Sequence, residues 1–186
     1  VGAFSLLAVK PSIYQLEVSA AGFATTVHRD IVVNVQSRLR FDVTLQPGAV
    51  QESILVTAAP PPLESETSSL GQVVENKLVI ALPLNGRNYA QLVSLIPGSA
   101  PIVASKASQD AFSLNGQRAF QNVYLIDGID NNNYILGLDT GSAQSLRPSV
   151  DAIQEFKVET ANYSAEFGRA AGGVISVSLK SGTNEF

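Results

Sequence analysis

With 186 residues, 45% of them hydrophobic and 15% charged, the chain is long enough to bury a core in one or two globular domains. Twelve Lys and Arg residues against sixteen Asp and Glu give a formal net charge of −4, so we expect no nucleic-acid partner. The absence of Cys excludes disulfides, thiolate metal sites and cysteine nucleophiles.

The sequence contains no Met and begins VGAFSLLAVK. We therefore expect a processed product or a piece of a longer protein, from which any signal peptide has been removed. No stretch approaches the ~18 consecutive apolar residues that a membrane-spanning helix needs.

The first 48 residues show the period of two that is typical of half-buried antiparallel strands. In IYQLEVSA, Leu16 and Val18 alternate with polar residues, and residues 31–35 indicate a second strand. In RLRFDVTLQ, Leu39 to Leu45 alternate in the same way before Pro47-Gly48 ends the run. Three strands are too few for an independent sandwich, so residues 1–48 predict the back part of a truncated, small antiparallel β-sandwich.

Residues 49–71 indicate a boundary between domains. The segment ILVT could form a strand, but Ala-Ala-Pro-Pro-Pro and a run of Glu, Ser and Thr follow at once. Three successive prolines stiffen the backbone and remove three hydrogen-bond donors, so we expect a semi-rigid linker here.

Residues 72–186 predict an α+β domain, a mixed sheet with short helices. Tyr89, Leu92, Val93 and Ile96 recur at helical spacing, with Asn88 as N-cap and Pro97-Gly98 as the stop. Strands are expected in AFSLNGQ, VYLID, EFKVET and GGVISVSLK, a short helical turn near residues 148–153, and loops at 99–110 and 128–147.

The stretch YLIDGIDNNN gathers oxygen-bearing side chains from Asp127 to Asn133 and could in principle hold a metal ion. Neither Asp127 nor Asp130 starts a frame with the ligand spacing of a calcium loop. An Asp-Gly pair directly after a β run is a common turn signal, so a turn is the better interpretation and no metal is expected.

Nothing in the sequence indicates an enzyme or a cofactor. His28 is the only histidine and no G-x-S-x-G elbow exists, so we expect His28 in an exposed loop. The glycine-rich FGRAAGGV lacks the pattern of a phosphate loop and favours a tight backbone approach before the last strand. Glu155, Glu159 and Glu166 are expected to be ordinary solvated charges.

Taken in order, these pieces resemble a known family. PSIYQLEVSAAGFATTVHRDIVVNVQSRLRFDVTLQPG resembles a carboxypeptidase-regulatory-like β-sandwich, and ESILVTA resembles a TonB box. LPLNGRNYAQLVSLIPG, FSLNGQRAFQNVYLIDGIDNNN and SVDAIQEFKVETANYSAEFGRAAGGVISVSLKSGTN resemble the plug domain of TonB-dependent outer-membrane transporters of the Oar-like kind. YLIDG corresponds to the plug strand that usually reads vlvDG.

The resemblance implies that the chain is a fragment: a plug that gates transport through a transmembrane barrel not included here. The implied partners are the TonB C-terminal domain, that barrel and an unidentified substrate contacted by the loops at 99–110 and 128–147. The implied location is the outer membrane, with the N-terminal part in the periplasm. The residues matching the TonB box are Glu52, Ser53, Ile54, Leu55, Val56, Thr57 and Ala58. Those matching the plug motif are Asn115, Gly116, Arg118, Asp127, Gly128, Gly168, Gly172 and Gly173.

Two other interpretations stay open at this point. The chain could be a free-standing extracellular or periplasmic β-rich module that binds carbohydrate or peptide. A hydrolase is a third and remote possibility, because the residues that would carry such chemistry are missing.

Overall fold

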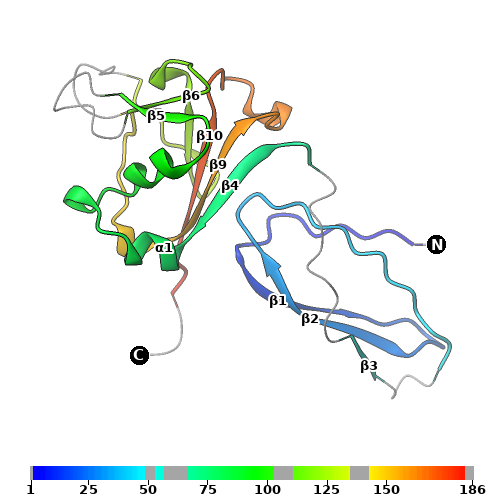
Figure 1. Ribbon diagram of the computed structural model, residues 1–186. Helices are drawn as coiled ribbons and strands as arrows, with labels where there is room; N and C mark the ends of the chain where they lie inside the picture. Colours follow the sequence, from blue (N-terminus) through cyan, green and yellow to red (C-terminus); the bar gives the residue numbers. More distant parts are fainter. Residues whose placement is uncertain (1, 49–52, 57–66, 103–110, 135–142, 183–186) are drawn as a thin grey trace. The chain divides into compact units, whose positions relative to one another are not determined.

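The computed structural model describes residues 2–48, 53–56, 67–102, 111–134 and 143–182. The chain forms two compact units, Val1–Thr67 and Ser68–Phe186. Figure 1 shows the strands and helices of both.

The N-terminal unit contains one three-stranded sheet in the order β1-β2-β3. Its strands are β1 (Ser12–Val18), β2 (Thr25–Val33) and β3 (Ser53–Val56). β1 and β2 pair antiparallel, as the alternation predicts, whereas β3 adds to β2 in parallel. Among the described residues of this unit, the buried apolar side chains are Ala24, Val27 and Ile31, which belong to β2 or directly precede it.

The strand expected at residues 38–46 does not form a ladder with a neighbour. Its alternation is present, because Leu39, Phe41 and the next two apolar residues are half-buried between exposed neighbours. Within the described residues the backbone pairs only at the end, in an isolated bridge of Pro47 with Phe23, which precedes β2. An extended chain places alternate side chains on opposite faces whether or not it is paired, so the pattern predicts the faces but not the pairing.

His28 also differs from expectation. It lies within β2 instead of in an exposed loop, is half-buried, and its ring centroid is 6.2 Å from that of Phe41.

The C-terminal unit is built on a five-stranded mixed sheet in the order β4-β9-β10-β7-β8. β9 pairs antiparallel with both β4 and β10, while β10 and β7 run parallel. The strands are β4 (Leu70–Glu75), β7 (Val123–Ile126), β8 (Ile129–Asp130), β9 (Ile153–Ala161) and β10 (Val174–Leu179). A separate two-stranded sheet consists of β5 (Ser99–Pro101) and β6 (Phe112–Leu114), so part of the expected 99–110 loop is a strand.

Short helices accompany this sheet (Figure 1). They are α1 (Asn76–Ala81), η1 (Asn85–Arg87), η2 (Tyr89–Leu95), η3 (Ala119–Gln121), η5 (Val150–Ala152) and η6 (Ala165–Phe167), where η denotes a 3₁₀ helix. η2 is the helix expected after Asn88, whose side-chain oxygen accepts a hydrogen bond from the backbone N–H of Ala90 at 3.0 Å. It forms as a 3₁₀ helix, with Leu92 and Val93 buried as predicted.

The hydrophobic core forms where α1, η2 and η5 pack against the sheet. The sheet contributes Phe156 and Val158 from β9 and Ile175 and Val177 from β10, the apolar sets that alternation assigns to one face. Tyr89 of η2 packs edge-on against Phe156, with ring centroids 5.4 Å apart. Among the described residues, no helix is both long and apolar enough to cross a membrane.

Candidate functional site

The segment resembling a TonB box is partly visible as β3. Its Cα atoms pair with those of β2, with Thr25 opposite Ser53 and His28 opposite Val56 at the two ends. Glu52, Thr57 and Ala58 lie outside the described residues. β3 is the last strand of its sheet, so β2 occupies one edge of its backbone and the other edge has no partner strand in the described part of the chain.

Four of the plug-motif residues form two tight turns with positive φ. Asn115 and Gly116 (φ 50° and 78°) follow β6, and Asp127 and Gly128 (φ 47° and 81°) connect β7 to β8. Positive φ at both central positions favours Asn-Gly and Asp-Gly, so the turns explain these residue types.

The side chains of these turns attach them to the rest of the unit. The Asn115 amide donates to the backbone oxygen of Thr160 at 2.6 Å. A carboxylate oxygen of Asp127 accepts from the backbone N–H of Leu179 at 3.1 Å. Both turns are therefore attached to strands of the main sheet.

The asparagines after Asp130 bind backbone groups. The Asn132 side chain accepts from the Tyr124 N–H at 3.0 Å and donates to the Asn122 carbonyl at 2.9 Å. The Asn131 side chain is bonded to both backbone groups of Leu146, each at 2.8 Å. The side-chain oxygens of Asn131 and Asn132 thus accept hydrogen bonds from the backbone N–H groups of Leu146 and of Tyr124 in β7.

A buried asparagine that the sequence did not single out links three segments. Asn122 is 1% exposed, and its amide donates to the Phe112 carbonyl at 2.9 Å. Its side-chain oxygen accepts from the Gly173 N–H at 3.1 Å. The only hint in the sequence is the Gly172-Gly173 pair, because a glycine pair before a strand signals a close approach without naming its partner.

The glycines of FGRAAGGV make the tight approach predicted for them. A Cβ on Gly172 would collide with the Asn122 amide, and one on Gly173 would lie 2.7 Å from the Glu159 backbone oxygen. Gly168 differs, because the nearest atom to its Cβ position is 3.8 Å away.

The expectation that Glu155, Glu159 and Glu166 are solvated is wrong for the two that lie on β9. Glu155 and Glu159 are 6% and 4% exposed, and only Glu166 is exposed as expected. Lys157, between the first two, lies with its ammonium 3.4 Å from a Glu159 carboxylate oxygen. β9 is a central strand, and alternation alone does not tell whether the second face of such a strand is covered.

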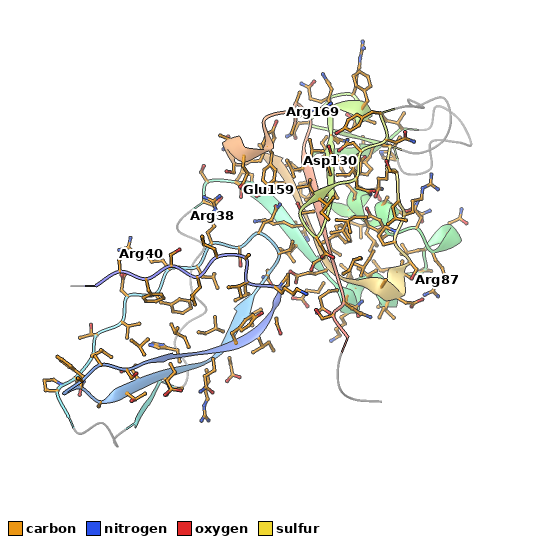
Figure 2. All side chains as sticks on the ribbon, turned by 180° about the vertical axis from the view of Figure 1, so that it is seen from behind. Arg38, Arg40, Arg87, Asp130, Glu159 and Arg169 are labelled. Atoms are coloured by element: carbon orange, nitrogen blue, oxygen red, sulfur yellow. The ribbon has the colours of Figure 1, made fainter. Side chains whose placement is uncertain are left out.

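Asp130 and Arg169, both labelled in Figure 2, each interact with Tyr134. The Tyr134 hydroxyl donates to an Asp130 carboxylate oxygen, and the Arg169 guanidinium lies 4.5 Å from the centroid of the Tyr134 ring. Burial alone would raise the pKa of Asp130, but hydrogen bonds from Tyr134 and the Asn132 N–H, with the charge of Arg169, lower it below its ordinary value of 3.8.

Arg118, another plug-motif residue, lies apart from this group. Its side chain is exposed, with the guanidinium 5.9 Å from the centroid of the Phe120 ring. Nothing in the described residues brings it together with Gly168 or Gly172 into one site.

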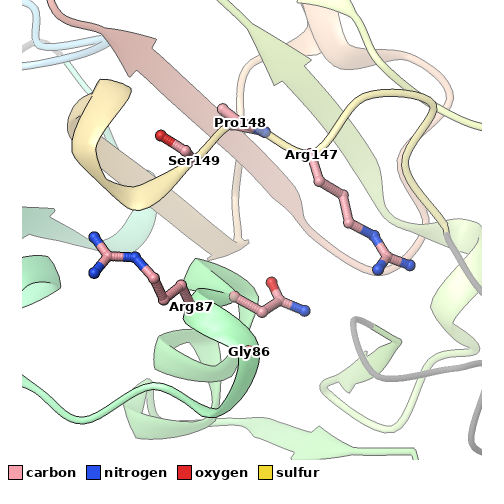
Figure 3. A pocket seen from close by; sticks show the side chains of 6 residues that line it. Gly86, Arg87, Arg147, Pro148 and Ser149 are labelled. Atoms are coloured by element: carbon pink, nitrogen blue, oxygen red, sulfur yellow. The ribbon is translucent and has the colours of Figure 1, made fainter.

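An open cavity of about 280 Å³ lies between η1 and the segment before η5 (Figure 3). Its lining includes Arg87, Arg147 and Ser149. The Arg87 guanidinium donates to both carboxylate oxygens of Asp151, at 2.7 and 2.8 Å, and points away from that of Arg147. The cavity is lined by polar and apolar groups alike, and the positive charge of Arg87 is matched by Asp151.

Comparison with solved structures defines the class of fold. Outer membrane transporter YddB from Escherichia coli aligns with a TM-score of 0.54 and 23% identity, over 60% of this chain and 17% of that one. The siderophore receptor PirA from Acinetobacter baumannii aligns with a TM-score of 0.52 and 24% identity, over 66% and 19%. The fold is thus shared with a part of outer-membrane transporters and receptors.

Sequence comparison identifies the family. Residues 65–174 match the model of the TonB-dependent receptor plug domain, and the chain belongs to that family. The TonB-dependent transporter Oar of Myxococcus xanthus is 27% identical over 195 residues, covering the whole of this chain. The chain spans 17% of the length of that relative.

Proposed function

We propose that this chain is the plug region of an energy-coupled outer-membrane transporter and that it closes the lumen of a transmembrane barrel supplied by the rest of that protein. The observation that carries the proposal is the plug-family match over residues 65–174, supported by the fold shared with outer-membrane transporters. The N-terminal unit would lie on the periplasmic side.

The partner for energy coupling would be the TonB C-terminal domain, bound at residues 52–58. Strand addition uses backbone hydrogen bonds, so a short β-prone segment is the kind of site it needs. The extended conformation of Ser53–Val56 supports this assignment. Pulling on the segment would move or locally unfold the plug and open a path for substrate.

Substrate would meet the plug at the loops of residues 99–110 and 128–147. The Asn131 and Asn132 side chains hydrogen-bond the described part of the second loop to other segments. This part of the loop would therefore present substrate contacts at fixed positions. We also propose that the chain is not an enzyme, because gating requires no covalent bond to be made or broken.

A pair of substitutions at one position tests the coupling site. Leu55→Pro removes a backbone N–H, so we expect it to weaken binding of the purified TonB C-terminal domain to this chain about tenfold or more. Leu55→Ala keeps the N–H and should bind within about threefold of the original, since backbone pairing carries the contact. Unchanged binding of the Pro variant in calorimetry would place the coupling site elsewhere.

A further inference from the structure

The coupling segment is already part of a sheet before any partner arrives. Its four residues pair in register with β2, from Thr25 opposite Ser53 to His28 opposite Val56. β2 in turn pairs with β1 along most of its length, so the segment rests on a two-stranded support (Figure 1).

This pairing leaves one side of the segment for a partner. The N–H and C=O groups of a strand point alternately to its two edges, and a free peptide offers both edges to an incoming strand. In β3 one edge faces β2, and the other has no partner strand among the residues that the structure describes.

We propose that the β1–β2 pair presents Ser53–Val56 as a preformed edge strand, and that TonB adds its own strand to the open edge without detaching β3 from β2. The proposal rests on the function proposed above and adds how its partner docks. The complex would be a mixed sheet of four strands in the order β1-β2-β3-TonB.

Two physical arguments favour docking onto the sheet over release from it. A segment held extended has already lost its backbone freedom, so strand addition costs less than it would on a flexible chain. The edge that TonB needs is open in the described residues, so no hydrogen bond to β2 has to break first. Release of β3 from β2 would break their hydrogen bonds. It would expose a second edge of β3, but a single added strand needs only one edge.

A reversible crosslink tests this directly, because the chain has no Cys of its own. Thr26 and Ile54 are Cα partners across β2 and β3, and neighbouring strands lie at about the spacing that a disulfide spans. The variant Thr26→Cys with Ile54→Cys therefore fixes β3 to β2 when oxidised. The matched control, Thr26→Cys with Val18→Cys, shares one substitution but fixes β2 to β1.

Binding of the purified TonB C-terminal domain is then measured on the oxidised and reduced forms of both variants. The proposal predicts that the oxidised β2–β3 variant binds within about threefold of its reduced form, or more tightly. If oxidation weakens its binding about tenfold or more while the control is unaffected, β3 must detach and the proposal is wrong, although the coupling site stands.

Two further results would also overturn the proposal. If neither form binds TonB, and the unsubstituted chain does not bind either, the proposed coupling function itself fails. If the β2–β3 disulfide does not form under conditions that give the β1–β2 disulfide, β3 does not lie beside β2.

Discussion

Several asparagine side chains hydrogen-bond to the main chain of other segments in this molecule. Asn115, Asn122, Asn131 and Asn132 each bind main-chain groups of another segment. The loops that the polar composition predicts are therefore anchored at their described ends, and the asparagine-rich stretch is explained by structure before any ligand is invoked.

Removing the Asn122 amide should be costly. Asn122→Ala leaves the Phe112 carbonyl and the Gly173 N–H without their partner, and each unsatisfied buried group costs about 1–3 kcal/mol. We expect the free energy of unfolding to fall by about 3 kcal/mol in urea denaturation. Gln154→Ala, at an exposed position of β9, should change it by less than about 0.5 kcal/mol and serves as the control.

Substitution by Ala should have different effects at Gly173 and at Gly168. Gly173→Ala places Cβ against the Glu159 backbone oxygen, which cannot move away without disturbing β9, so we expect a loss of about 1–3 kcal/mol. Gly168→Ala makes only an ordinary van der Waals contact, at 3.8 Å, and should be neutral or slightly stabilising. Equal thermal unfolding midpoints for the two variants would contradict the close approach.

The Asp130 carboxyl offers a test by titration. The pKa of Asp130 is lowered in the folded chain, so its contribution to stability is present above the ordinary value of 3.8 and is lost as pH falls through the folded pKa. Carboxyl NMR should give a midpoint below 3.8 for Asp130. Tyr134→Phe removes a hydrogen bond to the ionised form and should move the midpoint upward; an unchanged midpoint would mean that the hydroxyl does not bind Asp130 in solution.

Among elements, those with strict alternation were predictable from the sequence. β9 and β10 carry the expected core faces, and η2 carries the buried side chains expected of residues 89–96. The Asp127-Gly128 turn was equally predictable, because few other residues accept positive φ at both positions, whereas the strand expected in AFSLNGQ ends at Leu114 and the chain turns at Asn115-Gly116.

The elements that were missed depend on long-range pairing. LGQVVE has no alternation that marks β4, and this strand exists because β9 offers it a partner more than eighty residues later in the chain. Residues 38–46 alternate well but gain only a terminal bridge. The burial of Glu155 and Glu159 and the partner of β3 likewise could not be predicted, since a local pattern does not name its neighbours.

The ion pair on β9 should matter more than a surface pair. Lys157→Met leaves the buried Glu159 carboxylate without its cation, which we expect to destabilise the chain by about 2–4 kcal/mol. Adding Glu159→Gln removes the uncompensated charge and should recover part of the loss. A double variant that is less stable than Lys157→Met in urea denaturation would show that the carboxylate is held by something other than Lys157.

At the scale of the whole molecule, the two units suit different tasks. Ser68–Phe186 contains the larger core and the plug-family match, whereas Val1–Thr67 buries few apolar side chains and carries the candidate coupling strand. The gate that we propose needs a folded unit that fills the lumen and a segment to which a partner can bind by strand addition.

The conductance of the complete transporter that contains this chain tests the central claim most directly. Reconstituted in a planar bilayer, the intact protein should conduct almost no ions, because our proposal has residues 68–186 close the lumen. Deleting these residues should convert it to a steadily open channel, while deleting residues 2–48 should leave it closed. If the intact and plug-deleted proteins conduct equally, or neither forms a pore, the chain is not the gate proposed here.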